Sequence, residues 1–285
     1  MLRICSKEEF IDYIDFAYEL ASDLTKSGYP TYCDGVKTKA MFMERSLKAF
    51  DRETEQILLF EYEGKVDGLI HYYFLPEDNY LDTCFFLADK AIDRALSEFR
   101  AYAAANFPGY DLFLGFPADN QTAVNFLAGH GFECIESDYN NTSFLTRFEH
   151  IKENRNVIRI RQDNYRLFQM LHNQIEGDMY WNSERIYEDL DHWTVYVKEK
   201  EGKPLGAVYY MDARDGWFEI FGIDIDRDAY DPELFKELLE AALFDARSRN
   251  GRVMTFFCDE EYEWAAKECG FDCIGKYLCY KTHLE

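Results

Sequence analysis

The feature that most constrains the fold of this chain is an internal duplication. The segment EGKVDGLIHY at Glu63–Tyr72 recurs as EGKPLGAVYY at Glu201–Tyr210, with five of ten residues identical at an offset of 138. A second segment, GFECI at Gly131–Ile135, recurs as GFDCI at Gly270–Ile274, at an offset of 139. Two separate matches share one offset, which is about half of the 285 residues. The sequence therefore predicts two copies of one domain.

We expect the two domains to be residues 1–150 and 151–285, joined near His150–Asn156, where the polar run HIKENRN separates two apolar stretches. The hydrophobic periodicity predicts an α/β (α+β) domain in each half, with the same order of elements in both. In the first half we expect strands near 57–62, 69–75, 83–87, 110–116 and 133–148, and helices near 10–21, 38–50, 89–106 and 122–129. In the second half we expect strands near 195–198, 207–211, 217–225 and 253–257, helices near 232–247 and 261–268, and further strands after residue 270.

Charge and composition exclude several classes of function. The formal net charge of −23 repels phosphate backbones and anionic lipid, so we expect neither nucleic acid nor membrane as a partner. No apolar run approaches the roughly 20 residues of a membrane span, and MLRICSKEEF at the start lacks the apolar core of a signal peptide. The eight cysteines form no CxxC pair, which is typical of thiols in a reducing cytoplasm. We therefore expect a cytoplasmic globular protein.

The order of elements and one motif carry a resemblance to a known family. Asn120, Ala123 and Leu127 precede Gly131-Phe132 at the spacing N-x-x-A-x-x-x-Y-x-x-x-G-F, except that leucine replaces the tyrosine. The chain thus resembles the GCN5-related N-acetyltransferase (GNAT) family. The duplication makes it similar to a tandem member, with two GNAT-like domains that each hold a mixed central sheet flanked by helices.

The resemblance implies a site for acetyl-CoA as cosubstrate. In the family, the cofactor lies where the fourth strand splays from its neighbour, and main-chain groups of that strand hold the pantetheine. This places Gly222, Ile223 and Ile225 at the cofactor, although a simple bulge explains Gly222 equally well. Asn120 is either a further cofactor contact or the N-cap of a helix. Glu219, on the same strand among aromatic residues, is the candidate general base, with a solvated outward position as the alternative.

The sequence departs from the family at the pyrophosphate. The family's R-x-x-G-x-G/A loop is replaced in the second half by DRDAYDPELF, where Tyr230, Glu233 and Phe235 stand for the arginine and the glycines. In the first half, Ala88–Ala91 contains no glycine. Acidic side chains in such a loop oppose a pyrophosphate. No histidine or cysteine spacing indicates a metal.

Two functions remain open after these observations. The first is an N-acyltransferase that moves an acetyl group from acetyl-CoA to a small-molecule or peptide amine by direct attack, with the second half as the active one. The alternative is a catalytically silent GNAT-fold pseudoenzyme that binds a small molecule or a protein partner. Aromatic segments at Tyr29–Gly35 and Tyr180–Asn182 either cover the acceptor site or pack at an interface.

Overall fold

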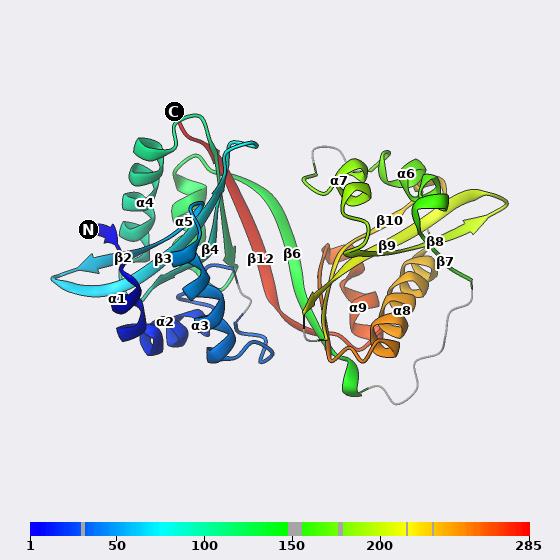
Figure 1. The fold of residues 1–285 in the computed structure, drawn as a ribbon, viewed down its shortest axis with the longest axis horizontal. Coiled ribbons are helices and arrows are strands. Elements are labelled where there is room, and N and C mark those ends of the chain that lie inside the picture. The colour runs from blue at the N-terminus through cyan, green and yellow to red at the C-terminus, as the bar shows by residue number, and fades with distance from the viewer. Residues whose placement is uncertain (30–31, 148–155, 176–178, 215, 230) are drawn as a thin grey trace. The chain divides into compact units, whose positions relative to one another are not determined.

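The computed structural model describes residues 1–29, 32–147, 156–175, 179–214, 216–229 and 231–285. Most of the predicted joint at His150–Asn156 therefore lies outside the described residues. The chain forms two compact units (Figure 1). The first unit is Met1–Asp138 together with Gly275–Glu285, and the second is Tyr139–Ile274. The division into residues 1–150 and 151–285 stays a prediction about domain boundaries.

The first unit is a mixed sheet between two helical layers. Its strands run in the order β1-β2-β3-β4-β5-β12-β6. The bounds are β1 Leu2–Ile4, β2 Glu55–Tyr62, β3 Lys65–Leu75, β4 Tyr80–Ala88 and β5 Asp111–Pro117, with β6 (Glu133–Phe144) and β12 (Asp272–His283) shared between the units. The helices are α1 Lys7–Asp12, α2 Ile14–Ala21, α3 Lys39–Leu47, α4 Ile92–Asn106 and α5 Gln121–Gly129. One apolar core lies between the sheet and α4–α5, and a second lies beneath α1–α3.

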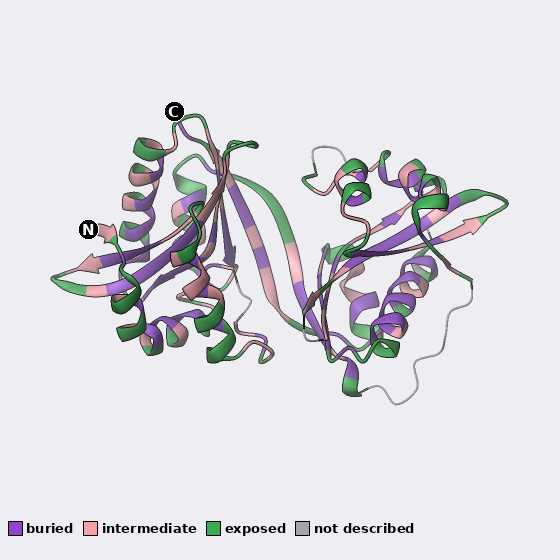
Figure 2. Ribbon diagram, viewed as in Figure 1, coloured by how far each residue is buried: buried purple, intermediate pink, exposed green. Residues whose placement is uncertain are grey.

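The second unit repeats this plan with the strand order β6-β11-β10-β9-β8-β7. Its strands are β7 Ile158–Arg159, β8 Trp193–Lys200, β9 Lys203–Arg214, β10 Trp217–Ile225 and β11 Val253–Cys258. Its helices are α6 Arg166–His172, α7 Ser183–Glu188, α8 Pro232–Ser248 and α9 Glu263–Glu268. α8 and α9 cover one face of the sheet and α6 and α7 the other, so buried residues concentrate on the strands and on the inner sides of the helices (Figure 2). Among the described helices, none has the length and apolar content that a membrane crossing requires.

Both duplicated motifs are turns that need left-handed backbone. Glu63-Gly64 and Glu201-Gly202 have positive φ at both positions (50° and 75°, 55° and 80°), as the tight turn of a β-hairpin requires. The Gly-Phe motif follows α5 and α9, where Gly131 and Gly270 have φ of 79° and 81°. Glycine ends a helix in this conformation without a Cβ clash, and the next residue, a buried phenylalanine, returns the chain to the core. Both copies of each duplicated motif therefore share the same turn geometry.

Each unit is completed by a strand from the other half of the chain. In the first unit, Tyr277–His283 of β12 pairs antiparallel with β5. In the second unit, Tyr139–Phe144 of β6 pairs antiparallel with β11. A strand pairing of this kind supplies a row of main-chain hydrogen bonds, so neither half of the chain holds a complete sheet by itself.

This exchange predicts that the two halves do not separate after the chain is cut. A specific protease site inserted after Lys152 and then cleaved leaves both exchanged strands paired. We expect the two fragments to elute together in size-exclusion chromatography under native conditions and to separate only in denaturant. Independent elution of two folded fragments without denaturant would contradict the exchange.

Candidate functional site: a strand splay in each unit

In each unit, two parallel strands pair at their beginnings and then diverge. β4 pairs with β5 only at Tyr80 and Leu81, whereas β10 pairs with β11 over Trp217–Ile220. Beyond these points β4 and β10 continue beside their antiparallel neighbours β3 and β9. We call the opening between the diverging strands the splay. Among the described residues, no named strand pairs with that side of β4 or β10 beyond these points.

The registers show that the two splays are equivalent, at an offset of 137. Tyr72 lies opposite Thr83 and His71 opposite Phe85, so Cys84 is the extra residue of a bulge in β4. Tyr210 lies opposite Ile220 and Tyr209 opposite Gly222, so Phe221 is the extra residue in β10. Two residues before each bulge is a carboxylate, Asp82 in β4 and Glu219 in β10. The predicted base Glu219 therefore has a counterpart in the first unit that sequence comparison at an offset of 138 missed.

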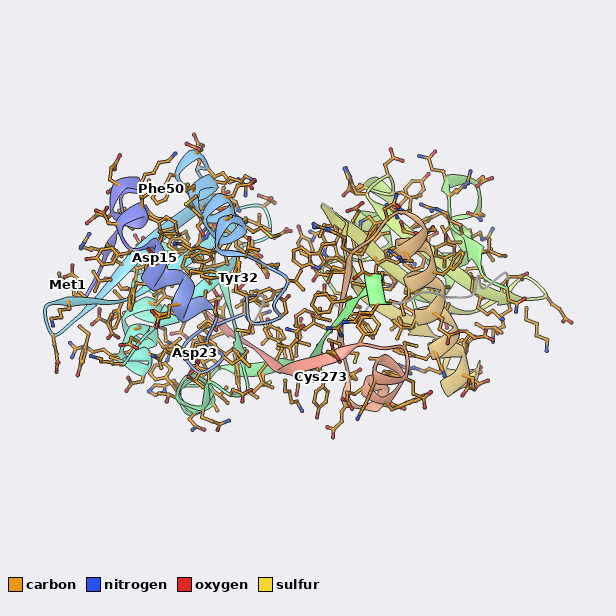
Figure 3. All side chains as sticks on the ribbon, turned by 90° about the horizontal axis from the view of Figure 1, so that it is seen from below. Met1, Asp15, Asp23, Tyr32, Phe50 and Cys273 are labelled. Carbon is orange, nitrogen blue, oxygen red and sulfur yellow. The ribbon has the colours of Figure 1, made fainter. Side chains whose placement is uncertain are left out.

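The splay of the first unit is filled by the chain itself. Residues Lys26–Tyr29, in the connection between α2 and α3, lie between β4 and β5; Asp23 and Tyr32, on either side of this segment, are labelled in Figure 3. On the β4 side, the Gly28 amide donates to the Phe86 carbonyl at 2.7 Å and the Ala88 amide to the Lys26 carbonyl at 3.1 Å. On the β5 side, the Tyr29 amide donates to the Gly115 carbonyl at 2.8 Å.

One further hydrogen bond and one steric constraint fit this segment to its place. Asn120 is buried; its Oδ1 accepts from the Ala123 amide at 3.2 Å and its Nδ2 donates to the Ser27 carbonyl at 3.2 Å. It is thus the N-cap of α5, and its role as a cofactor contact stays a prediction. Gly28 has no room for a side chain, because a Cβ there would lie 2.8 Å from the Gly115 oxygen.

A carboxylate occupies the start of the helix that follows β4. Asp67, a buried residue of β3, accepts hydrogen bonds through Oδ2 from the amides of Lys90 and Ala91 at 3.2 and 3.1 Å. These amides lie immediately before the first residue of α4, at the helix end whose dipole favours an anion. An internal acid therefore binds the two amides that immediately precede α4.

The splay of the second unit is more exposed. After the bulge, Phe85–Ala88 of β4 are all buried, whereas in β10 only Asp224 is buried and Gly222, Ile223 and Ile225 are half-buried. Phe221 itself is 37 % exposed. Ile223 and Ile225 correspond to Phe86 and Ala88, whose main-chain groups bind the Lys26–Tyr29 segment. Between described residues, no hydrogen bond reaches Ile223 or Ile225 across the splay.

Glu219 and Gly222 are both on β10 at the edge of this splay. Glu219 is half-buried and lies in register with Met211 of β9 and Thr255 of β11. Its neighbours Phe218 and Ile220 point into the core beneath α8, so Glu219 is on the sheet face covered by α6 and α7. Gly222 follows the bulge, and a Cβ there would lie 2.1 Å from the Tyr209 hydroxyl. Its lack of a side chain makes room for the Tyr209 ring, and its predicted role at the cofactor is untested.

A buried histidine–aspartate pair fixes β10 to α6. His172 Nδ1 lies 2.7 Å from Asp224 Oδ2, and its Nε2 lies 2.9 Å from the Trp181 carbonyl. A carbonyl oxygen can only accept, so Nε2 carries a hydrogen, and the contact with Asp224 holds one proton between the two side chains. The pair therefore ties β10 to the backbone of Trp181, within the predicted acceptor-site segment. The sequence carries no local signal for this pairing.

The loop between β10 and α8 satisfies its own amides with aspartates. Asp226 accepts from the Asp228 amide at 2.9 Å and forms an ion pair with Lys203 at 2.7 Å. Asp231 accepts from the Glu233 amide at 3.0 Å and so caps α8. Tyr230, which was expected at the arginine position of the family loop, lies outside the described residues. In the described part of this loop, aspartate side chains therefore bind the amides of Asp228 and Glu233.

One cluster in the first unit has the residue types of a metal site. Ligand atoms of Glu55, His71 and Cys84 lie within 4.8 Å of one another. Arg45 and Arg52 both donate to the Glu55 carboxylate, and Arg45 Nη2 lies 3.3 Å from Cys84 Sγ. Burial raises the pKa of Cys84 to about 12, so the thiol stays protonated. Two guanidinium groups and a neutral thiol do not suit a cation, and the prediction that no metal is used stands as a prediction.

Asp82, the carboxylate beside the first splay, has a raised pKa. Burial raises its pKa to about 6, although hydrogen bonds from the Thr83 amide and from the hydroxyls of Tyr80 and Tyr73 oppose the shift. The folded state therefore holds this proton more tightly than the unfolded chain between about pH 4 and pH 6. Over that range, the group lowers the free energy of unfolding as the pH rises.

Asp82→Asn removes this dependence. We expect the stability of the variant relative to the unchanged protein to rise by about 1–2 kcal/mol between pH 4 and pH 7, less than the full shift because the side chain retains some contact with solvent. Denaturant unfolding at the two pH values measures it. A stability difference that is the same at both pH values would mean that Asp82 ionises normally.

Comparison with known proteins finds similar folds at low sequence identity. No family model matches the sequence, and no curated protein matches it. A GCN5-related N-acetyltransferase from Sphaerobacter thermophilus has a similar structure, with a TM-score of 0.65 at 11 % identity over 100 % of this chain and 96 % of that chain. A tandem GNAT protein from the clavulanic acid biosynthesis pathway aligns with a TM-score of 0.57 at 12 % identity, over 100 % and 99 %. Saccharomyces cerevisiae N-myristoyltransferase, solved with myristoyl-CoA and inhibitors, aligns with a TM-score of 0.52 at 11 % identity, over 99 % and 80 %.

Proposed function

We propose that this chain, which has the tandem GNAT fold that its sequence predicts, is an N-acyltransferase with its active site at the splay of the second unit. The donor is acetyl-CoA and the acceptor a small-molecule or peptide amine. The observation that carries the proposal is that Gly222, Ile223 and Ile225 of β10, beyond its bulge, are half-buried, with the Glu219 carboxylate on the same strand. The fold of the similar structures supports the reaction class, and a fold alone does not fix an activity.

The residues of β10 divide the reaction between them. The amides of pantetheine pair with the main chain of Ile223 and Ile225, in the way that Lys26–Tyr29 pairs with β4 in the first unit. The acceptor nitrogen attacks the thioester carbonyl, so a C–N bond forms and the C–S bond breaks. Glu219 takes the proton that the amine loses, directly or through a water molecule, and the CoA thiolate leaves and is protonated from solvent.

The acidity of the protein favours a cationic acceptor. A net charge of −23 attracts amines over the whole surface. Near the splay, Trp181 and Trp193 both pack against Phe221 in edge-to-face contacts with ring centroids 6.3 and 5.1 Å away. Aromatic rings close to a carboxylate suit the carbon chain and the charge of an amine.

A second candidate function rests on the loop before α8. Asp226, Asp228 and Asp231 stand close to where a pyrophosphate would bind, and two of them already occupy loop amides. This favours a pseudoenzyme that binds a ligand without phosphates or a protein partner. Calorimetric titration with acetyl-CoA distinguishes the two functions, because the pseudoenzyme gives no heat at millimolar cofactor whereas the enzyme binds it in the micromolar range.

Glu219→Gln tests the chemistry. We expect kcat for acetyl transfer to fall by about 10²–10⁴-fold, while the Kd for acetyl-CoA changes less than about twofold, because the amide cannot accept the proton. Release of the CoA thiol with a panel of primary amines measures the rate. The matched control is Asp82→Asn, which changes the equivalent carboxylate of the first unit and is expected to leave kcat within about twofold. Equal losses in both variants would contradict the assignment.

Ile225→Pro tests the cofactor contact. Proline removes the N–H that faces the splay and leaves the pairing with β9 in place, as is tolerated at the free side of a strand. We expect acetyl-CoA affinity to fall by about tenfold, the loss of roughly one hydrogen bond. Ile225→Val keeps the N–H and should bind normally. Titration calorimetry measures both variants, with thermal unfolding as the check that each is folded.

A further inference from the structure

We infer that the first unit is a self-liganded copy of the acyl-CoA site, in which residues Lys26–Tyr29 take the place of pantetheine and Asp67 takes the place of phosphate. The chain then binds one acyl-CoA rather than two. The number of cofactors rests on the function proposed above, whereas the closure of the first splay stands on contacts within the first unit alone.

The main-chain hydrogen bonds of Lys26–Tyr29 are of the kind that a ligand lying along a strand edge makes. Pantetheine is a flexible chain with two amide groups, and a strand edge binds it as it would bind a peptide. The bonds of Gly28 and Lys26 to β4 and of Tyr29 to β5 satisfy both sides of the splay. The bonds to Phe86 and Ala88 therefore use the main-chain groups whose counterparts in β10, at Ile223 and Ile225, are proposed to hold the cofactor.

The segment is also fitted to this position by its side chains. Ser27 is 1 % exposed, and Lys26 Nζ forms an ion pair of 2.6 Å with Asp89 at the end of β4. The ring of Tyr29 packs edge-to-face on Tyr277 with centroids 5.5 Å apart. A segment that only passed the splay would not combine burial, a glycine where no Cβ fits, and contacts with both strands.

The phosphate position is closed by an independent contact. Asp67 comes from β3, not from the Lys26–Tyr29 segment, and its carboxylate binds the amides of Lys90 and Ala91. The equivalent of Asp67 at the repeat offset of 138 is Leu205, which cannot bind an amide through its side chain. The second unit therefore lacks this internal acid from β9, and α8 is capped by its own Asp231. Two unrelated contacts in the first unit thus close the two parts of one site.

Residue-resolved amide hydrogen exchange, with and without acetyl-CoA, tests the inference on the full-length protein. We expect the Gly28 and Ala88 amides to be protected in the free protein and unchanged by the cofactor, and the Ile225 amide to gain at least about tenfold protection when the cofactor is added. Calorimetry should give one site, which Ile225→Pro weakens. Rapid exchange of Gly28 and Ala88, a gain of protection there with acetyl-CoA, or two calorimetric sites would overturn the inference.

The same data separate this inference from the proposed function. If acetyl-CoA gives no heat and no protection at Ile225, while Gly28 and Ala88 remain protected, the proposed function fails and the closed splay of the first unit stands. If acetyl-CoA binds and protects Gly28 and Ala88 instead of Ile225, the cofactor is held by the first unit and the inference fails.

A pair of glycine variants tests the fit of the segment. Gly28→Ala places a Cβ 2.8 Å from the Gly115 oxygen and 3.2 Å from Phe86 Cβ, so the segment must lift from the splay. We expect exchange of the Ala88 amide to accelerate by at least about tenfold. Gly129→Ala is the matched control, because a Cβ there meets nothing within 4 Å. Equal exchange at Ala88 in both variants would overturn the close fit, and the exchange pattern of the unchanged protein decides the matter if Gly28→Ala does not fold.

Discussion

The arrangement of both units depends on the main-chain hydrogen bonds that a strand loses when it leaves its parallel neighbour. The pairing with the parallel neighbour ends at Leu81 in β4 and at Ile220 in β10, and a one-residue bulge against the antiparallel neighbour follows, at Cys84 and Phe221. Buried main-chain groups need partners, and an unpaired group costs about as much as a lost hydrogen bond. Each splay must therefore be filled by water, by a ligand or by the protein itself. Whether a unit can bind a ligand at its splay depends on which of these three fills it.

The two units meet this requirement in opposite ways. In the first unit the chain supplies the partners, and the strand beyond the bulge is buried: Phe86 and Leu87 have no exposed surface. In the second unit the corresponding residues are Ile223, which is half-buried, and Asp224, which is buried. Asp224 is held by His172, where the first unit has only the apolar Leu87. A duplicated domain can keep its sheet while one copy exchanges a ligand for its own backbone, because the hydrogen-bond geometry is the same.

The sequence predicted the repeated elements of the fold well and the long-range pairings poorly. The hairpin turn at Glu63-Gly64 and the Gly-Phe motif are local, since left-handed backbone restricts which residues can stand there. The exchanged strands and the insertion of Lys26–Tyr29 depend on partners far apart in the chain, and nothing in their own composition marks them. The same holds for Asp67, a single acid in a strand whose partner amides are 23 and 24 residues away.

The sequence alone suggested Glu219 as a candidate base and gave no sign of its counterpart in the first unit. Glu219 was identified from one strand, whereas its counterpart Asp82 was hidden because the bulged strands align at an offset of 137 and the hairpins before them at 138. The connection from β3 to β4 and that from β9 to β10 differ by one residue. If both halves are aligned at an offset of 138, residues of β4 are therefore matched with residues on the opposite face of β10. Once the bulges are aligned, a carboxylate appears at the same register position in both units. This carboxylate lies beside a closed splay in one unit and a more exposed splay in the other, so the proposed function rests on the exposed strand beyond the bulge as well as on the acid.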